Sequence, residues 1–238
     1  MTRPQLIDLT VAKLEEISPF VEPESLLARD DAGNNNVKPI KSYINEMLDD
    51  AARYCLDVLP FTLLAKDIET YKNQTVKVDE KGVGRLYSVV NKSSNPEVTV
   101  FSSIDTYVRP VRVAVAAWAH HVRAFITSMD ALYMVQQDED ARGKTEKPCV
   151  AIVPEDKCLE LFSFPESDWA EAGQEKDYSG EVTFSLIKTN KVAENVSSDI
   201  AHFIAIRCCE LVLNIFNDTN HAAICAKEFT DKMNSVLK

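Results

Sequence analysis

Hydrophobic residues recur at helical spacing near both ends of the chain and alternate with polar residues in its middle. The clearest helical pattern runs from Lys41 to Pro60, where apolar positions follow the i, i+3, i+4, i+7 spacing of an amphipathic helix. Ser42 is placed to cap its start, and Pro60 marks its end. The predicted apolar face holds Ile44, Met47, Leu48, Ala51, Cys55, Val58 and Leu59, and the polar face holds Glu46, Asp49, Asp50, Arg53 and Asp57.

Shorter helical patterns occur nearer the two ends. Apolar residues at positions 7, 11, 14 and 17 predict a helix over residues 6–17, which the prolines that follow would end. The polar segment 29–39 is expected to be an exposed loop. Residues 195–199 offer caps for a helix with a broad apolar face, and a last helix follows the break at 217–221. The apolar side of that last helix would contain Ala222, Cys225, Phe229 and Met233.

The middle of the chain has the period of two that is typical of β-strands. The segments PCVAIV and CLELFSF flank PEDK, whose turn residues predict a β-hairpin. Val111, Val113 and Val115 alternate with Arg112 and Ala114, as in a half-buried strand. The expected extended segments are 75–90, with turns at its glycines, 97–103, 107–118 and 181–189.

The order of these elements predicts the fold class. Helices come first, strands follow and helices return, which indicates an α+β protein. Residues 1–74 and 191–238 are expected to form a helical bundle, and residues 75–190 an inserted β-rich domain.

Composition and charge exclude several classes of function. The net charge of −11 argues against nonspecific binding to nucleic acid and against binding to anionic membranes. No apolar run follows the first four residues, so no signal peptide is expected. The longest apolar stretch, 200–216, is too short and too polar to span a bilayer. The six cysteines form no CxxC pair and several lie on apolar helix faces, which predicts reduced thiols in the core.

Acidic residues are concentrated in one part of the chain. Residues 136–181 hold thirteen Asp and Glu against five Lys and Arg, a net −8 of the total −11. This segment is either a solvated surface or an acidic face presented to a partner. The arginines upstream would be available to pair with it, within the chain or between copies. They are Arg85, Arg109, Arg112 and Arg123.

Residues with catalytic or metal-binding chemistry are few. His120 and His121 are adjacent, so their side chains diverge on a helix or on a strand. His221 and Cys225 have the i, i+4 spacing of a helical metal pair, but two ligands make no site. The segment Gly82-Val-Gly84 lacks the Lys-Ser/Thr of a phosphate loop and is predicted to be a turn. We therefore expect no catalytic, cofactor-binding or metal-binding residues.

Two further pairs of residues have alternative interpretations. Asp49 and Asp50 point in different directions on a helix, so a solvated helix face is favoured over a carboxylate pair. Trp118 and Trp169 could each belong to the core or to an interface, and the sequence does not separate these alternatives.

Two stretches resemble proteins of the bacteriophage head-to-tail connector. YINEMLDDAARYCLDVLP is similar to the acidic amphipathic helix that opens many connector proteins. GRLYSVV, TYVRPVRVAVAAWAHHV and the segment from ALYMVQQ to LFSF resemble a ring (adaptor) protein of short-tailed, crAss-like phages. The similarity spans residues 40–165, although AAWAHHV is less basic than the family pattern. The shared elements are Arg109, Trp118, Tyr133, Gln136, Gln137, Lys147 and Pro148.

The resemblance implies an architectural role in the virion. Such proteins are made in the host cytoplasm and form a ring of twelve copies below the portal, extending the DNA channel and docking adjacent ring or tail proteins. An acidic channel wall would let DNA pass without specific binding. Ring packing is heterologous, so the helix 41–59 would serve both the fold and a neighbouring copy. No catalysis, cofactor or membrane contact is implied.

Two other classes of function remain open at this point. A metal-dependent enzyme using His221 and Cys225 would contain metal when purified. A monomeric binding module would have the same composition, and its mass in solution would distinguish it from a ring protein.

Overall fold

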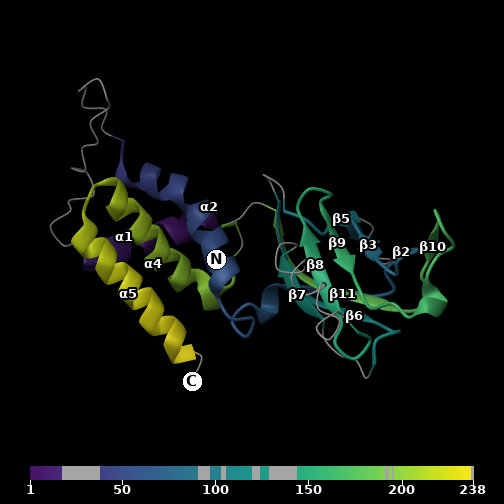
Figure 1. Ribbon diagram of the computed structural model, residues 1–238. Coiled ribbons are helices and arrows are strands. Elements are labelled where there is room, and N and C mark those ends of the chain that lie inside the picture. The colour runs from purple at the N-terminus through teal and green to yellow at the C-terminus, as the bar shows by residue number, and fades with distance from the viewer. Residues whose placement is uncertain are drawn as a thin grey trace. The chain divides into compact units, whose positions relative to one another are not determined.

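The computed structural model describes residues 1–17, 38–90, 97–102, 106–119, 124–128, 144–190, 193–194 and 196–236. Within them the protein is mixed α+β, as the sequence predicts, with four α-helices and three β-sheets. The chain divides into two compact units. One comprises residues 1–67 and 191–238 and is called the helical unit, and the other comprises residues 68–190 and is called the strand unit (Figure 1).

The helical unit is organised around one apolar helix. Its elements are α1 (Arg3–Ile17), α2 (Ile40–Val58), α4 (Ser198–Ile215) and α5 (Thr219–Val236). Helix α4 packs against all three others, and ten of its residues are buried. The Cys208 thiol lies 3.6 Å from the carbonyl of Ile44, and the Cys209 thiol lies 3.5 Å from that of Thr10. Helix α4 is thus the core element on which α1, α2 and α5 are assembled.

The helix ends correct two details of the prediction. Helix α2 begins at Ile40, which is buried, so Pro39 takes the N-cap position and Ser42 lies in the first turn. The prediction of Ser42 as the cap is therefore wrong. In α4 the Ser197 side chain accepts a hydrogen bond from the Asp199 amide, which confirms a cap within 195–199. The break before α5 is shorter than predicted because Asp218 accepts from the His221 amide and starts the helix at Thr219.

The strand unit contains three sheets. The three-stranded sheet has the order β1 (Ile68–Tyr71), β11 (Val182–Asn190), β6 (Thr106–Val115), and both pairings are antiparallel. The six-stranded sheet has the order β10 (Glu175–Asp177), β2 (Lys77–Asp79), β3 (Gly84–Leu86), β9 (Cys158–Leu161), β8 (Cys149–Val153), β7 (Phe125–Ser128), with a parallel pairing of β7 and β8. Strands β4 (Ser88–Val90) and β5 (Glu97–Thr99) pair separately. Short 3₁₀ turns occur at Ala65–Asp67 and Glu166–Asp168.

One apolar core joins the three sheets. Phe184 and Leu186 of β11 contribute to it from the three-stranded sheet, and Leu159 and Leu161 of β9 contribute from the six-stranded sheet. Because side chains alternate along a strand, each of the two larger sheets has a second face that points away from this core. Arg85 lies on the second face of the six-stranded sheet, and Arg112 lies on the second face of the three-stranded sheet.

A β-bulge in β6 changes which residues share a face. Ser185 lies opposite Arg112, but the next residue, Leu186, lies opposite Pro110, so Val111 is the extra residue. Arg109 lies opposite Ile187, which is on the same face as Ser185. The bulge therefore brings Arg109 and Arg112 to one face, although simple alternation would place them on opposite faces.

Local predictions in this unit are mostly confirmed. The PEDK turn joins β8 and β9 as an antiparallel hairpin, with Val153 opposite Cys158. Residues 68–71 were assigned to the helical region by sequence, but they form β1 and pair with β11. The division between the units accordingly lies between Asp67 and Ile68, not at residue 74.

Candidate interaction surfaces

The pair His221 and Cys225 does not form the start of a metal site. The His221 Nδ1 atom lies 2.7 Å from Asp218 Oδ2 at the beginning of α5, whereas Cys225 is fully buried. Burial raises the pKa of the Cys225 thiol to about 12, so the thiolate that metals prefer is strongly disfavoured. Within the part of the chain that the structure describes, no three His, Cys, Asp or Glu side chains gather as metal ligands would.

Other sequence candidates have structural roles. Asp49 binds Arg3 through both carboxylate oxygens, at 2.8 and 3.2 Å, and so ties α2 to α1. Asp50 is exposed. Gly82 has φ +74° in the β2–β3 turn, which confirms the predicted turn. His120, His121, Arg123 and the segment 133–140 lie outside the described residues.

An exposed apolar surface lies at the C-terminal end of helix α2. Tyr54 and Val58, one turn apart on the helix, are each 39% exposed, and Phe61, in the turn that follows the helix, is 40% exposed. The prediction that Val58 is buried is wrong, because the chain becomes extended at the C-cap and Leu59 takes the buried position. The Arg207 guanidinium lies 4.1 Å from the centre of the Tyr54 ring and holds that ring in place. The apolar face that α2 buries in the core therefore continues into exposed large apolar side chains at the end of the helix.

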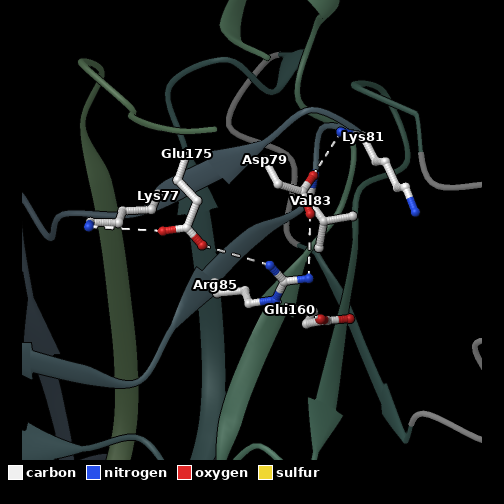
Figure 2. Close-up of polar contacts among 7 residues, drawn as sticks. All are labelled: Lys77, Asp79, Lys81, Val83, Arg85, Glu160 and Glu175. Carbon is white, nitrogen blue, oxygen red and sulfur yellow. Dashed lines mark hydrogen bonds and ion pairs between the residues drawn. The ribbon is translucent and has the colours of Figure 1, made fainter. Parts of the chain in front are cut away.

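A charged cluster lies on the outer face of the six-stranded sheet. Arg85 on β3 reaches carboxylates on three neighbouring strands (Figure 2). Its guanidinium lies 3.1 Å from Glu160, 3.4 Å from Asp79 and 4.0 Å from Glu175, and Lys77 lies 3.9 Å from Glu175. Burial alone would lower the pKa of Arg85, but the carboxylates of Glu160 and Asp79 raise this pKa overall, so Arg85 stays positively charged.

The cluster fastens the edge of this sheet. Glu160 is only 7% exposed, so its charge depends on Arg85 directly opposite on β3. The other oxygen of Asp79 accepts the amides of Lys81 and Val83 at 2.9 and 3.0 Å, which orders the β2–β3 turn. The two cations of the cluster are therefore already paired with carboxylates of the same unit. The predicted pairing of an upstream arginine with the acidic segment 136–181 is thus confirmed for Arg85.

The two tryptophans belong to different environments. Trp118 is 3% exposed and packs in the core of the strand unit. Trp169 is 37% exposed, and its Nε1 donates to the carbonyl of Phe164 at 2.8 Å. Its ring covers Gly82 so closely that a Cβ there would lie 2.3 Å from Nε1. Trp118 is thus a core residue, and Trp169 is an exposed aromatic ring that is fixed in place.

A shallow groove lies between α1, α4 and α5. Its volume is about 390 Å³, and Ala12, Ala205 and Ile206 form part of its apolar floor. The charges at its rim pair with one another, since Lys13 lies 2.9 Å from both Glu16 and Glu228. The rim therefore leaves no unpaired charge of one sign among these residues to select a ligand.

All six cysteines are buried free thiols. Burial raises their pKa values, to about 12 for Cys208 and about 11 for Cys158, so the thiolate is disfavoured. They pack as apolar side chains and none has the environment of a nucleophile. No described helix combines the length and the hydropathy that a membrane crossing requires.

Comparison with known proteins does not assign the chain to a family. No protein-family model matches the chain, and no curated protein matches its sequence. The resemblance to connector proteins therefore stays a prediction from the sequence, and the surfaces above carry the functional argument.

Proposed function

We propose that the protein is a structural ring protein of a bacteriophage head-to-tail connector, with its helices as a bundle and the strand unit as an inserted domain. The observation that carries this proposal is the exposed apolar surface of α2, formed by Tyr54, Val58 and Phe61. Large apolar side chains grouped on a surface mark a protein contact more often than a catalytic site. The same helix contributes eight buried residues to the core, as a helix that serves both fold and neighbour must.

The remaining properties fit this role. A ring of twelve copies below the portal would bury the α2 surface between copies or against the portal, and other faces would dock adjacent ring or tail proteins. The net charge of −11 suits a channel through which DNA passes without specific binding. The protein would be made in the host cytoplasm, reside in the virion, and act without catalysis or a cofactor.

The test is assembly with the portal. Purified protein mixed with its portal should give a multi-subunit complex by mass, because the portal ring supplies contacts that the acidic chain alone lacks. Val58→Asp and Phe61→Asp should prevent the complex. Burial of each apolar side chain would contribute about 1.5–3 kcal/mol to the contact, and each substitution would place a charge there instead.

Ile224→Asp is the matched control. Ile224 is also an exposed apolar residue of the helical unit, at 52%, but it lies on α5 and is not one of the three residues of this surface. It should leave assembly unchanged. Wild-type protein that stays monomeric beside an intact portal ring would contradict the proposal.

A further inference from the structure

The carboxylates of the strand unit differ in their ionic partners. Asp79, Glu160 and Glu175 lie within 4.0 Å of the Arg85 guanidinium. Glu166 and Asp168, which lie just before Trp169, and Glu171, which follows it, make no ion pair with any residue that the structure describes. Three carboxylates without such an ion pair thus flank the exposed tryptophan in the chain.

This region, the Trp169 tip, is rigid. It comprises Gly82 and residues 166–171. The ring hydrogen bond to Phe164 and the close contact with Gly82 fix Trp169. The amide of Ala170 donates to the Asp79 carbonyl at 3.3 Å, which ties the segment to the β2–β3 turn. A fixed aromatic side chain loses little entropy on binding, and a Trp among carboxylates is suited to a guanidinium.

A guanidinium without an ion pair among the described residues lies on the three-stranded sheet. Arg112 is half-buried on the outer face of the three-stranded sheet, and its buried Nε has no hydrogen-bond partner. No ion pair joins it to a residue in the described part of the chain. Beside it, Thr70 and Ser185 share a 2.9 Å hydrogen bond, so Arg112 lies next to neutral hydroxyls on a face that also carries Arg109. We call Arg112, Thr70 and Ser185 the Arg112 face.

We propose that the Trp169 tip of one copy docks on the Arg112 face of a second copy. The two surfaces have complementary charge, and each lacks an ionic partner among the residues that the structure describes. They lie on different sheets, and no described hydrogen bond or ion pair links them. Because the two surfaces differ, the contact is heterologous and repeats from copy to copy, which closes a ring or extends a filament. The inference rests on the proposed ring and names one of its contacts.

The test uses charge reversal and mixing. Arg112→Glu and Glu171→Arg should each weaken self-association of the full chain about tenfold or more, measured by sedimentation at high protein concentration and low salt. A mixture of the two variants should recover association, because the reversed charges then match at one of the two contacts. Added salt should weaken association of the wild-type chain.

Two control variants separate this contact from net charge. Lys157→Glu and Glu155→Arg make the same changes of charge in the exposed β8–β9 turn of the same unit, and they should leave association unchanged. Arg112→Gln tests the contact if Arg112→Glu does not fold, and it should also weaken association. Trp169→Ala should weaken it with the charge unchanged.

Three results would overturn the contact: unchanged association of folded Arg112 variants, no recovery in the mixture, or a wild-type chain that remains monomeric at every concentration. The proposed function is judged separately by assembly on the portal. If wild-type rings form there while both charge reversals assemble normally, the connector role stands and only this contact is wrong.

Discussion

The two units carry nearly the same net charge but arrange it differently. The helical unit has 12 Lys and Arg against 18 Asp and Glu, a net −6, and the strand unit has 14 against 19, a net −5. In the helical unit, pairs such as Lys41–Asp8 join helices at the surface, with both side chains more than half exposed. In the strand unit, one half-buried arginine gathers three carboxylates. The first unit therefore has exposed ion pairs between helices, whereas in the second unit three carboxylates converge on one arginine within a sheet.

The difference matters because burial decides what an ion pair contributes. An exposed pair is screened by water and contributes little to stability. A buried carboxylate such as Glu160 becomes costly as soon as its partner is removed. The separate cores of the two units allow each effect to be measured without the other.

The largest expected effect comes from the cores. Phe184 and Leu48 are fully buried in the strand and helical units respectively. Phe184→Ala should destabilise the strand unit by about 3–5 kcal/mol, and Leu48→Ala the helical unit by about 2–5 kcal/mol, because each leaves a cavity. Hydrogen exchange followed by peptide mass should show lost protection in the substituted unit alone. Equal loss in both units would mean that they unfold as one.

An intermediate effect is expected at the charged cluster. Arg85→Met should destabilise the strand unit by about 3 kcal/mol in urea unfolding, because it leaves Glu160 buried and unpaired. Adding Glu160→Gln should restore part of the loss, since the buried charge is then removed. Lys41→Ala is the comparison in the helical unit and should cause no measurable change. Similar losses for Arg85→Met and Lys41→Ala would remove the distinction between the units.

The smallest effect concerns Asp67 at the end of the helical unit. Burial, and then the nearby Asp199 carboxylate, raise the pKa of Asp67 above its ordinary value. Folding therefore favours the protonated form, and stability from this group is lost as pH rises through the raised pKa. Asp67→Asn should raise Tm at neutral pH by no more than about 2 °C, and the gain should vanish in acid. A gain that grows on acidification would contradict this assignment.

Local signals in the sequence were sufficient for the main elements. The apolar spacing of α2 and the PEDK turn each predicted an observed element, because helix periodicity and turn chemistry act over a few residues. The exposure of Val58 was missed because it depends on where the chain leaves the helix. Sequence periodicity indicates a face but not how far the neighbouring element extends along it.

The charged surfaces could not be predicted from the sequence, because they depend on contacts between residues that are far apart along the chain. Arg85 meets Glu160 and Glu175, which follow it by 75 and 90 positions, and strand order alone brings them together. The bulge at Val111, which places Arg112 beside Ser185, is defined by the register with β11. The sequence showed that segment 136–181 is acidic, but only the pairing shows which carboxylates are neutralised.

The burial of every cysteine makes the chain a reporter of its own unfolding. Cys55, Cys208, Cys209 and Cys225 belong to the helical unit, and Cys149 and Cys158 belong to the strand unit. A thiol-reactive reagent should find no target on the native protein, since the thiols are both covered and protonated. As denaturant is added, a mass gain of four labels would mark opening of the helices and a gain of two would mark opening of the sheets. Intact-mass spectrometry of the labelled wild-type protein would thus give the order in which the units open.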